Sequence, residues 1–345
     1  MNQLSLFTAL VLLAAGMLLS PAEGQAQSFG VPGSFTRIGI SPRGMSMGNA
    51  MSASTTGETP AIYNPALSAL DSGYRHLDLS TAALKYDRNL HSLSLRLPMP
   101  PTAGLSLHLI NAKVGKIDGR NSSGYHTGML STNEFKLAGQ FGIRLTDHLY
   151  AGIGISWFLA NYHTEVPNAT SVGLDFGILV TAHERLRLAV TVRDLLAGYD
   201  LDTSGLYSTE SRQGGIARFP VRYITGFSLA IAEELSLNGE VELRSSSLSK
   251  MSGGTALNAD TREAFSGKVW RSYFRMGTEY HLHERFTIRG GLQINEPGFA
   301  NSIQPAGGFS VHLPYDKYAP SVDYAFVREP SGISSMHVFA LRFRL

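Results

Sequence analysis

The side chains that could do chemistry are scattered along the chain and form no known catalytic motif. The eleven histidines include no HExxH pair, which would hold zinc on one face of a helix. His281 and His283 lie two residues apart, so on a strand they share a face and could bind a metal ion. A polar position lining a barrel explains this pair better. Neither a GxSxG elbow nor a P-loop occurs, and there is no cysteine. The sequence therefore predicts a protein that is not an enzyme, with no catalytic residue, metal or cofactor.

Two short motifs hold the candidate functional residues. Residues 41–50 contain Arg43, Gly44 and Gly48, and residues 61–66 contain Asn64, Pro65 and Ala66. Pro65 favours an extended Asn64, whose side chain can bind nearby backbone. This pair could fix an inner segment, or could simply start a short helix with proline at its first position. Arg43 could reach a carboxylate inside a barrel or the carboxylate of a ligand.

These motifs precede a long region in which apolar and polar residues alternate with period two, which is typical of strands with two different faces. Residues 134–145 place Phe135, Leu137 and Phe141 on one face and Lys136 and Gln140 on the other. Similar segments recur to the end of the chain, and we count about fourteen, most of about 8 to 13 residues, where a tilted membrane strand needs about 9–11. The fold class predicted is all-β, a transmembrane antiparallel barrel over residues 73–345.

Composition agrees with such a barrel. Charged residues make up 16% of the chain, below the roughly 25% of soluble domains, while the mean hydropathy is only -0.02. Only every second residue of a membrane strand faces lipid, so a barrel need not be hydrophobic overall. The net charge of +2 offers no argument for nucleic acid as a partner. We expect outer-membrane lipid to surround the protein.

The lengths of the connections predict the topology of the barrel and the side of the membrane on which the two termini lie. Short connections near 98–101, 146–148, 182–184, 232–234 and 283–284 alternate with longer ones near 114–132, 161–170, 195–218, 247–267 and 296–304. Membrane barrels have short periplasmic turns and long outer loops, so an even strand count places both termini in the periplasm. The apolar run 10–19 predicts a signal peptide over residues 1–26.

A barrel of this size needs something inside it, because side chains alone fill only about eight strands. Residues 27–72 lack strand alternation and are rich in glycine and alanine, so we expect them to form a hatch or plug, with short helices around 43–53 and 65–70. The alternative is a loose periplasmic tail.

The order of several short motifs along the chain resembles that of a known protein family. Residues 41–50, then 61–66, and later segments such as 117–120, 275–280 and 322–326 resemble the PorV/PorQ family of the Bacteroidetes-type type IX secretion system. That family is similar to the FadL fatty-acid transporters, which are fourteen-stranded barrels with an N-terminal hatch. The resemblance implies a non-enzymatic role in type IX secretion, with secretion-system proteins or secreted cargo as partners.

Two alternatives remain open. One is a FadL-like transporter of hydrophobic small molecules such as long-chain fatty acids, for which a hydrophobic ligand would be the partner. The other is a soluble secreted β protein that acts as a binding module, although the strand length and the loop pattern speak against it.

Overall fold

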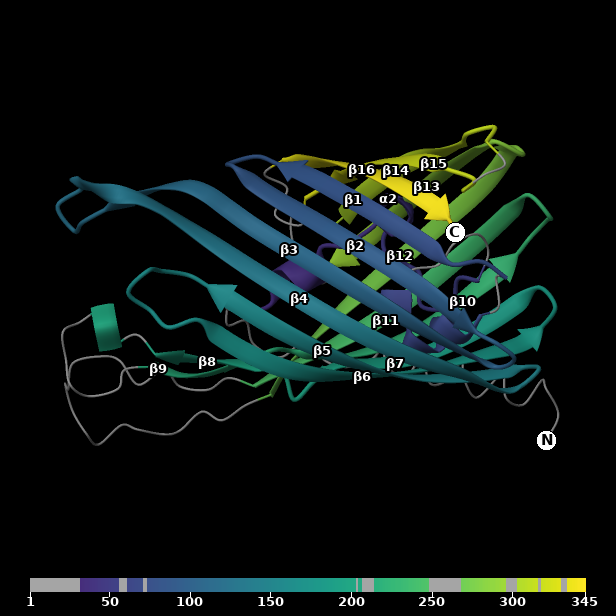
Figure 1. Cartoon of the computed structure of the whole chain (residues 1–345), viewed down its shortest axis with the longest axis horizontal. Coiled ribbons are helices and arrows are strands. Elements are labelled where there is room, and N and C mark those ends of the chain that lie inside the picture. Colours follow the sequence, from purple (N-terminus) through teal and green to yellow (C-terminus); the bar gives the residue numbers. More distant parts are fainter. Residues whose placement is uncertain are drawn as a thin grey trace.

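The protein is a closed β-barrel with a segment of its own chain inside. The computed structural model describes residues 32–55, 61–70, 73–202, 204–206, 214–247, 268–295, 303–315, 318–329 and 334–345. The predicted signal peptide, residues 1–26, lies outside these residues. Fourteen strands form one antiparallel sheet, in which β1 pairs with both β2 and β16 (Figure 1). Closure leaves no unpaired strand edge in the barrel, as a bilayer requires.

The wall of the barrel is built from strands between residues 76 and 344. They are β1 (His76–Leu84), β2 (Arg88–Met99), β3 (Ala103–Arg120), β4 (His126–Thr146), β5 (Leu149–Asn161), β6 (Ala169–His183), β7 (Leu186–Leu195), β10 (Val221–Ala230), β11 (Leu235–Ser247), β12 (Lys268–His283), β13 (Phe286–Asn295), β14 (Ile303–His312), β15 (Ser321–Arg328) and β16 (Ser335–Arg344). The predicted fold class and the count of about fourteen strands are confirmed.

Two further strands were not predicted. β8 (Gly198–Asp202) and β9 (Gly214–Arg218) form a separate two-stranded sheet, so β7 pairs with β10 across the gap in sequence. This sheet lies toward the end of the barrel opposite the C-terminus (Figure 1). Both strands fall in the connection expected near 195–218. Five-residue strands with glycines at their ends carry too little alternation to be recognised as a hairpin.

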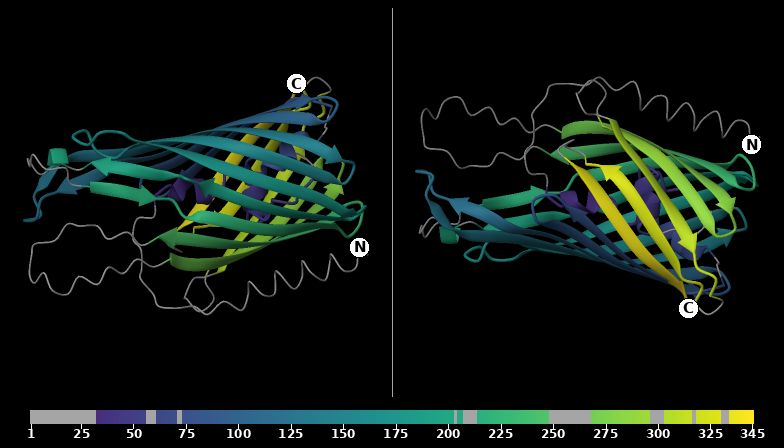
Figure 2. Two further views of the ribbon diagram at one scale, coloured as in Figure 1. Left: turned by 90° about the horizontal axis from the view of Figure 1, so that it is seen from below. Right: turned by 90° about the horizontal axis from the view of Figure 1, so that it is seen from above.

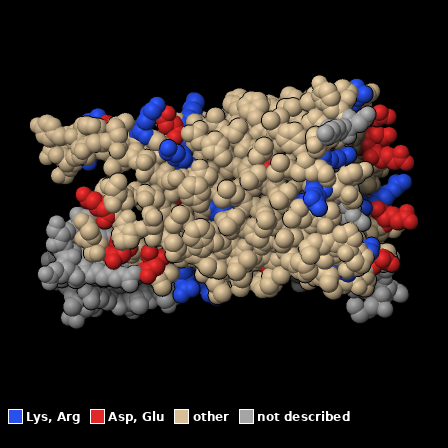
Figure 3. Space-filling view, viewed as in Figure 1, with Lys and Arg blue, Asp and Glu red and all other residues tan. Residues whose placement is uncertain are grey.

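The two faces of the wall have the predicted composition. On β4 and β5, Phe141, Ile155 and Trp157 point outward and are 40%, 58% and 46% exposed, while Lys136 and Gln140 are fully buried on the lumen side. Most of the charged side chains seen in Figure 3 gather toward the two ends and leave a band with few charges between them. An apolar outer band with a polar interior is the pattern of a barrel in lipid.

The alternation of residues 219–231 groups Phe219 with the apolar face of the strand that follows it. In the structure Phe219 instead precedes β10 and is only 3% exposed. Its backbone N–H donates to the carbonyl of Ala197 at 2.9 Å, which turns the chain inward before β10 begins. The ring therefore packs inside the protein.

The connections differ between the two ends of the barrel, as predicted. Residues 100–102, 147–148, 184–185 and 284–285 are tight turns at the end where the C-terminus lies. At the other end β3 and β4 pair out to Arg120 and His126, so much of the connection expected near 114–132 is strand. Which side of the membrane each end faces stays a prediction. Among the described residues, no helix is long and apolar enough to cross a bilayer.

Residues 32–55 and 61–70, here called the inner segment, lie within the ring of strands (Figure 2). They form η1 (Ser34–Arg37), α2 (Pro42–Ser46), η2 (Ala61–Tyr63) and η3 (Pro65–Ala69). α2 contacts β13 to β16, and η3 contacts β2 to β6, on different parts of the wall. α2 is shorter than the helix expected over 43–53, because Gly48 and Asn49 take left-handed backbone angles, with φ of 61° and 63°, that end it.

Candidate functional site: the inner segment and the lumen wall

Arg43 fastens the first half of the inner segment to the wall. It lies in α2, whose first turn is capped by the Ser41 hydroxyl, which accepts a hydrogen bond from the Gly44 N–H at 3.2 Å. The Arg43 Nε and Nη2 atoms donate to the two Glu279 carboxylate oxygens at 2.8 and 2.9 Å. Both side chains are 1% exposed. Of the two partners considered for Arg43, the lumen carboxylate is the one present. The ion pair is bidentate, with two parallel hydrogen bonds.

Glu279 is also the start of a chain of ion pairs along the inner wall. Arg289 on β13 lies 2.5 Å from Glu279 and 3.6 Å from Asp323 on β15. Arg342 on β16 binds the same Asp323 at 3.0 Å and Asp78 on β1 at 2.6 Å. Charges from β12, β13, β15, β16, β1 and α2 thus share one network, in which each described charge faces an opposite one.

Asn64 and Pro65 fasten the second half. The Asn64 Oδ1 atom accepts from the Ala66 N–H at 3.0 Å, which caps η3, and Pro65 occupies the first position of that helix. The Asn64 amide also donates to the Ser52 carbonyl at 2.9 Å and to the Ile178 carbonyl of β6 at 3.3 Å. The two interpretations of this motif hold together, since the same side chain starts the short helix and ties it to the wall.

Glycines on the lumen face of the wall let the inner segment approach the backbone closely. A Cβ atom on Gly152 would lie 2.4 Å from the Ala66 nitrogen, and one on Gly291 would lie 2.4 Å from the Met47 carbonyl carbon. An added Cβ atom would also overlap an atom of the inner segment at Gly104, Gly142, Gly177 and Gly277. In the inner segment, a Cβ on Gly48 would lie 2.5 Å from the Leu292 carbonyl oxygen, and one on Gly44 would lie 2.2 Å from the Tyr63 hydroxyl. Ala66 is fully buried in this contact.

We expect Gly291→Ala to lower the free energy of unfolding by about 1–3 kcal/mol, because an added methyl group would overlap the backbone of Met47 and Gly48. Gly290→Ala is the matched control: Gly290 is the preceding residue of β13, and a Cβ atom there would meet nothing within 4 Å. Urea titration of both variants in lipid vesicles measures the difference. Equal stability of the two would contradict the close packing of residues 47 and 48 on β13.

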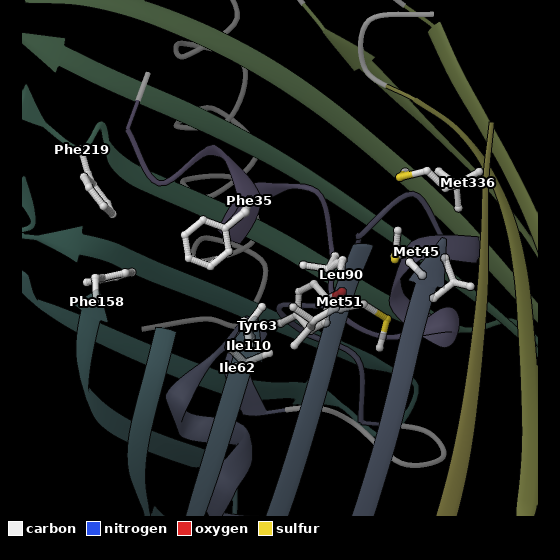
Figure 4. Packing of buried hydrophobic residues seen from close by; sticks show 14 of the residues in the cluster. Phe35, Met45, Met51, Ile62, Tyr63, Leu90, Ile110, Phe158, Phe219 and Met336 are labelled. Carbon is white, nitrogen blue, oxygen red and sulfur yellow. The ribbon is translucent and has the colours of Figure 1, made fainter. Parts of the chain in front are cut away.

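An apolar cluster fills the lumen beside these polar contacts. Phe35 of the inner segment, Phe158 of β5, Tyr199 of β8 and Phe219 are all buried. Figure 4 shows Phe35, Phe158 and Phe219 of this cluster. The Phe219 ring lies edge-on to Phe158 and to Tyr199, with 4.9 Å between centroids in each pair. β8 packs on β6 and carries Tyr199 into this cluster. The hairpin that sequence reasoning missed therefore supplies part of the apolar interior.

A second apolar feature lies on the outside of the barrel. A groove of about 610 Å³ crosses β1, β2, β3 and β16 and is lined by outward residues that include Leu79, Leu93 and Phe339. Its floor includes Ser80 and Ser92, whose hydroxyls donate to the Ile40 carbonyl of the inner segment at 2.9 and 2.7 Å. Only the strand backbone separates the groove from the inner segment at this point.

The histidine pair has ordinary local roles. The His281 Nδ1 atom lies 2.9 Å from the Thr287 hydroxyl, and the His283 Nδ1 atom accepts from the Arg285 N–H at 3.2 Å in the turn that follows β12. No group of three metal-ligating side chains occurs among the residues with described positions.

Comparison with known proteins identifies the fold. No family model matches the chain, and no curated protein does. Solved structures do match: the toluene transporter TbuX of Ralstonia pickettii has a TM-score of 0.60 at 15% identity, covering 89% of this chain and 98% of that one. The toluene transporter TodX of Pseudomonas putida gives 0.61 at 12% identity, with coverage of 89% and 98%. A FadL homologue of Pseudomonas aeruginosa gives 0.61 at 11% identity, with coverage of 88% and 98%. The chain thus has the barrel fold of FadL-type outer-membrane proteins.

Proposed function

We propose that this chain is an outer-membrane channel for small hydrophobic molecules. The observation that carries the proposal is the apolar cluster inside the lumen, where Phe35, Phe158, Tyr199 and Phe219 meet. A pore for polar solutes has a water-filled, polar interior. Here the inner segment occupies the lumen and brings apolar side chains into it, which favours an apolar solute. The barrels of similar fold include two named as toluene transporters.

The membrane setting belongs to the same proposal. An apolar outer band and complete strand closure suit a bilayer, and the fold is that of outer-membrane barrels. A signal peptide over residues 1–26, a hatch over 27–72 and periplasmic termini would complete this arrangement. In it Arg43, Gly44, Gly48, Asn64, Pro65 and Ala66 act as positioning residues that hold the hatch in the lumen.

The groove on the outer wall suggests where an apolar solute would meet lipid. It is apolar, faces the bilayer, and lies across the strand backbone from Ile40. A volume of about 610 Å³ is within the roughly 300–1,000 Å³ of small-molecule sites. We place the membrane side of the route at β1 and β2 for this reason.

Uptake by whole cells tests the proposal, because the lipopolysaccharide leaflet slows apolar solutes. A Gram-negative host that lacks its own fatty-acid channel would express the full-length protein, and uptake of labelled toluene, oleate and sucrose would be measured. We expect several-fold faster uptake of toluene or oleate and unchanged uptake of sucrose, relative to cells that express an unrelated barrel. Faster sucrose uptake, or no gain for either apolar probe, would refute the proposal.

A role in type IX secretion is the second candidate, and the order of the motifs in residues 41–50 and 61–66 is what favours it. No comparison supports this role. Deletion of the gene in its own host distinguishes the two: cargo retained in the periplasm would favour secretion, and normal secretion with slower hydrocarbon uptake would favour the channel.

A further inference from the structure

The groove on the outer wall is polar at one end only. Rows of leucines lie across β1, β2 and β3 in its middle and toward the C-terminal end of the barrel, namely Leu79, Leu93 and Leu109 and then Leu77, Leu95 and Leu107. Toward the other end, the next row on the same face also lines the groove and consists of Thr81, His91 and Asn111. The groove therefore suits a molecule that has an apolar tail and a polar head.

The polar row lies at the level where the wall leaves the hydrocarbon. Lys113 comes two residues after Asn111 on the outward face of β3, and it is exposed. A charge on the lipid face is costly at mid-membrane and far less costly near the interface, so Lys113 marks the interface. His91 lies just inside it. The His91 Nδ1 atom is 2.9 Å from the Thr81 hydroxyl, while its Nε2 atom has no partner among the described residues. A lipid head group at this level would meet both Lys113 and His91.

Positive charge is in excess at this end of the strands that line the groove. The described residues beyond the polar row on β1, β2, β3, β15 and β16 and in their turns include six basic side chains, Lys85, Arg88, Lys113, Lys116, Arg120 and Arg328, and three carboxylates, Asp87, Asp118 and Glu329. Each carboxylate already binds a cation, since Asp87 pairs with Lys116 at 3.3 Å, Asp118 with Arg120 at 2.7 Å and Glu329 with Arg88 at 2.8 Å. An anionic head group is therefore the electrostatic complement of this part of the wall.

We propose that the groove binds lipid A, the phosphorylated, multi-chain lipid of the outer leaflet. An acyl chain would lie along the leucine rows, and a phosphate would bind Lys113 and His91 at the polar end. A plain hydrocarbon has no group for these two side chains, whereas a lipid with an anionic head uses both parts of the groove. The inference rests on the membrane setting of the proposed function, because periplasmic termini place the polar end in the outer leaflet. Lipid A would then be the lipid that a solute meets at this wall.

Native mass spectrometry of the full-length protein tests this site. The protein would be purified in detergent from a Gram-negative outer membrane, freed of lipid, and then mixed with lipid A, phosphatidylglycerol or phosphatidylethanolamine at equal concentration. We expect one tightly retained lipid A molecule per barrel and several-fold weaker retention of both phospholipids. Retention of lipid A should decrease as the salt concentration rises, because exposed cations hold its phosphate.

Two pairs of variants test the two parts of the site. Lys113→Met should lower lipid A retention several-fold, whereas Lys268→Met, at an exposed lysine where β12 begins, should leave it unchanged. Leu93→Trp places a larger side chain in the groove and should also lower retention. Its control is Ile155→Trp, on the outer face of β5, which should retain lipid A as the unaltered protein does. All four residues lie on the outer surface, so the barrel should fold in each variant.

Three results would each overturn the proposal: no complex with lipid A, equal retention of phosphatidylglycerol, or full retention of lipid A by Lys113→Met or Leu93→Trp. Hydrocarbon uptake is measured separately. A barrel that retains lipid A but gives no uptake would refute the channel and leave this site in place, while uptake without lipid A retention would do the opposite.

Discussion

Glu279→Gln is expected to lower the free energy of unfolding by about 3–5 kcal/mol, the cost of breaking a buried ion pair by removing one partner. The glutamine keeps the size of the side chain but loses the charge that faces Arg43 at 2.8 Å and Arg289 at 2.5 Å. Both guanidinium groups are at most 4% exposed, so water cannot replace the carboxylate. Urea titration in lipid vesicles measures the loss.

The same change should also loosen the inner segment. Because Glu279 is the carboxylate that holds α2, we expect Glu279→Gln to give a larger ion conductance in planar bilayers than the unaltered protein. Asp118→Asn is the matched control, since Asp118 binds Arg120 at 2.7 Å in an exposed hairpin. It should leave stability and conductance nearly unchanged. Equal effects of the two substitutions would show that the Arg43 contact does not hold the inner segment.

Ile155→Arg has the second largest expected effect, a loss of about 2–4 kcal/mol, because it places a charge on the lipid face near the middle of the bilayer. Ile155 lies at the centre of β5, between Gly139 of β4 and Leu174 of β6, and is 58% exposed. Heat-modifiable migration on gels would report the loss of folded barrel, and urea titration its size.

Leu145→Arg is the control for depth. Leu145 lies on the same outer face but at the end of β4, next to the turn, and is 56% exposed. The cost there should be only about 0–1 kcal/mol, because an arginine near the interface reaches water. Equal losses of unfolding free energy for the two substitutions would contradict the placement of Ile155 near the middle of the bilayer and of Leu145 near its interface.

Much of the wall could be predicted from sequence because period-two alternation is a local property. Residues 134–145 place Gln140 inward and Phe141 outward without any knowledge of neighbouring strands, and the structure agrees. The sequence also predicts a tight first hairpin at residues 87–89, and the structure places the turn between β1 and β2 at residues 85–87. It contains Tyr86 and Asp87, with positive φ angles of 64° and 51°, which lets three residues reverse the chain.

The interior could not be predicted in the same way, because its contacts join residues far apart in the chain. Arg43 and Glu279 are separated by 236 residues, and nothing near either identifies the other. The alternation of residues 270–282 puts Glu279 on the polar face of its strand, but its partner depends on the register of the whole barrel. Lys136 likewise was placed inward, while its meeting with Asp194 needs the order of β4 to β7.

The sequence contains one signal for the wall positions against which the inner segment packs, and the predictions above do not draw on it. Glycines such as Gly142, Gly152 and Gly177 fall at inward positions of three successive strands, where a polar lumen gives no reason for a missing side chain. They mark the wall on which η3 lies. Glycines on an inward face can therefore indicate where an inner segment approaches the backbone.

The presence of the inner segment in the lumen can be tested most directly with a cross-link, because the chain contains no cysteine of its own. The hydroxyls of Ser68 in η3 and Ser106 on β3 are 3.1 Å apart, and both side chains are fully buried. In Ser68→Cys/Ser106→Cys, mild oxidation of the membrane-inserted protein should form a disulfide in nearly all molecules, seen by mass and by gel migration. A folded barrel whose two cysteines remain free would contradict an inner segment seated in the lumen.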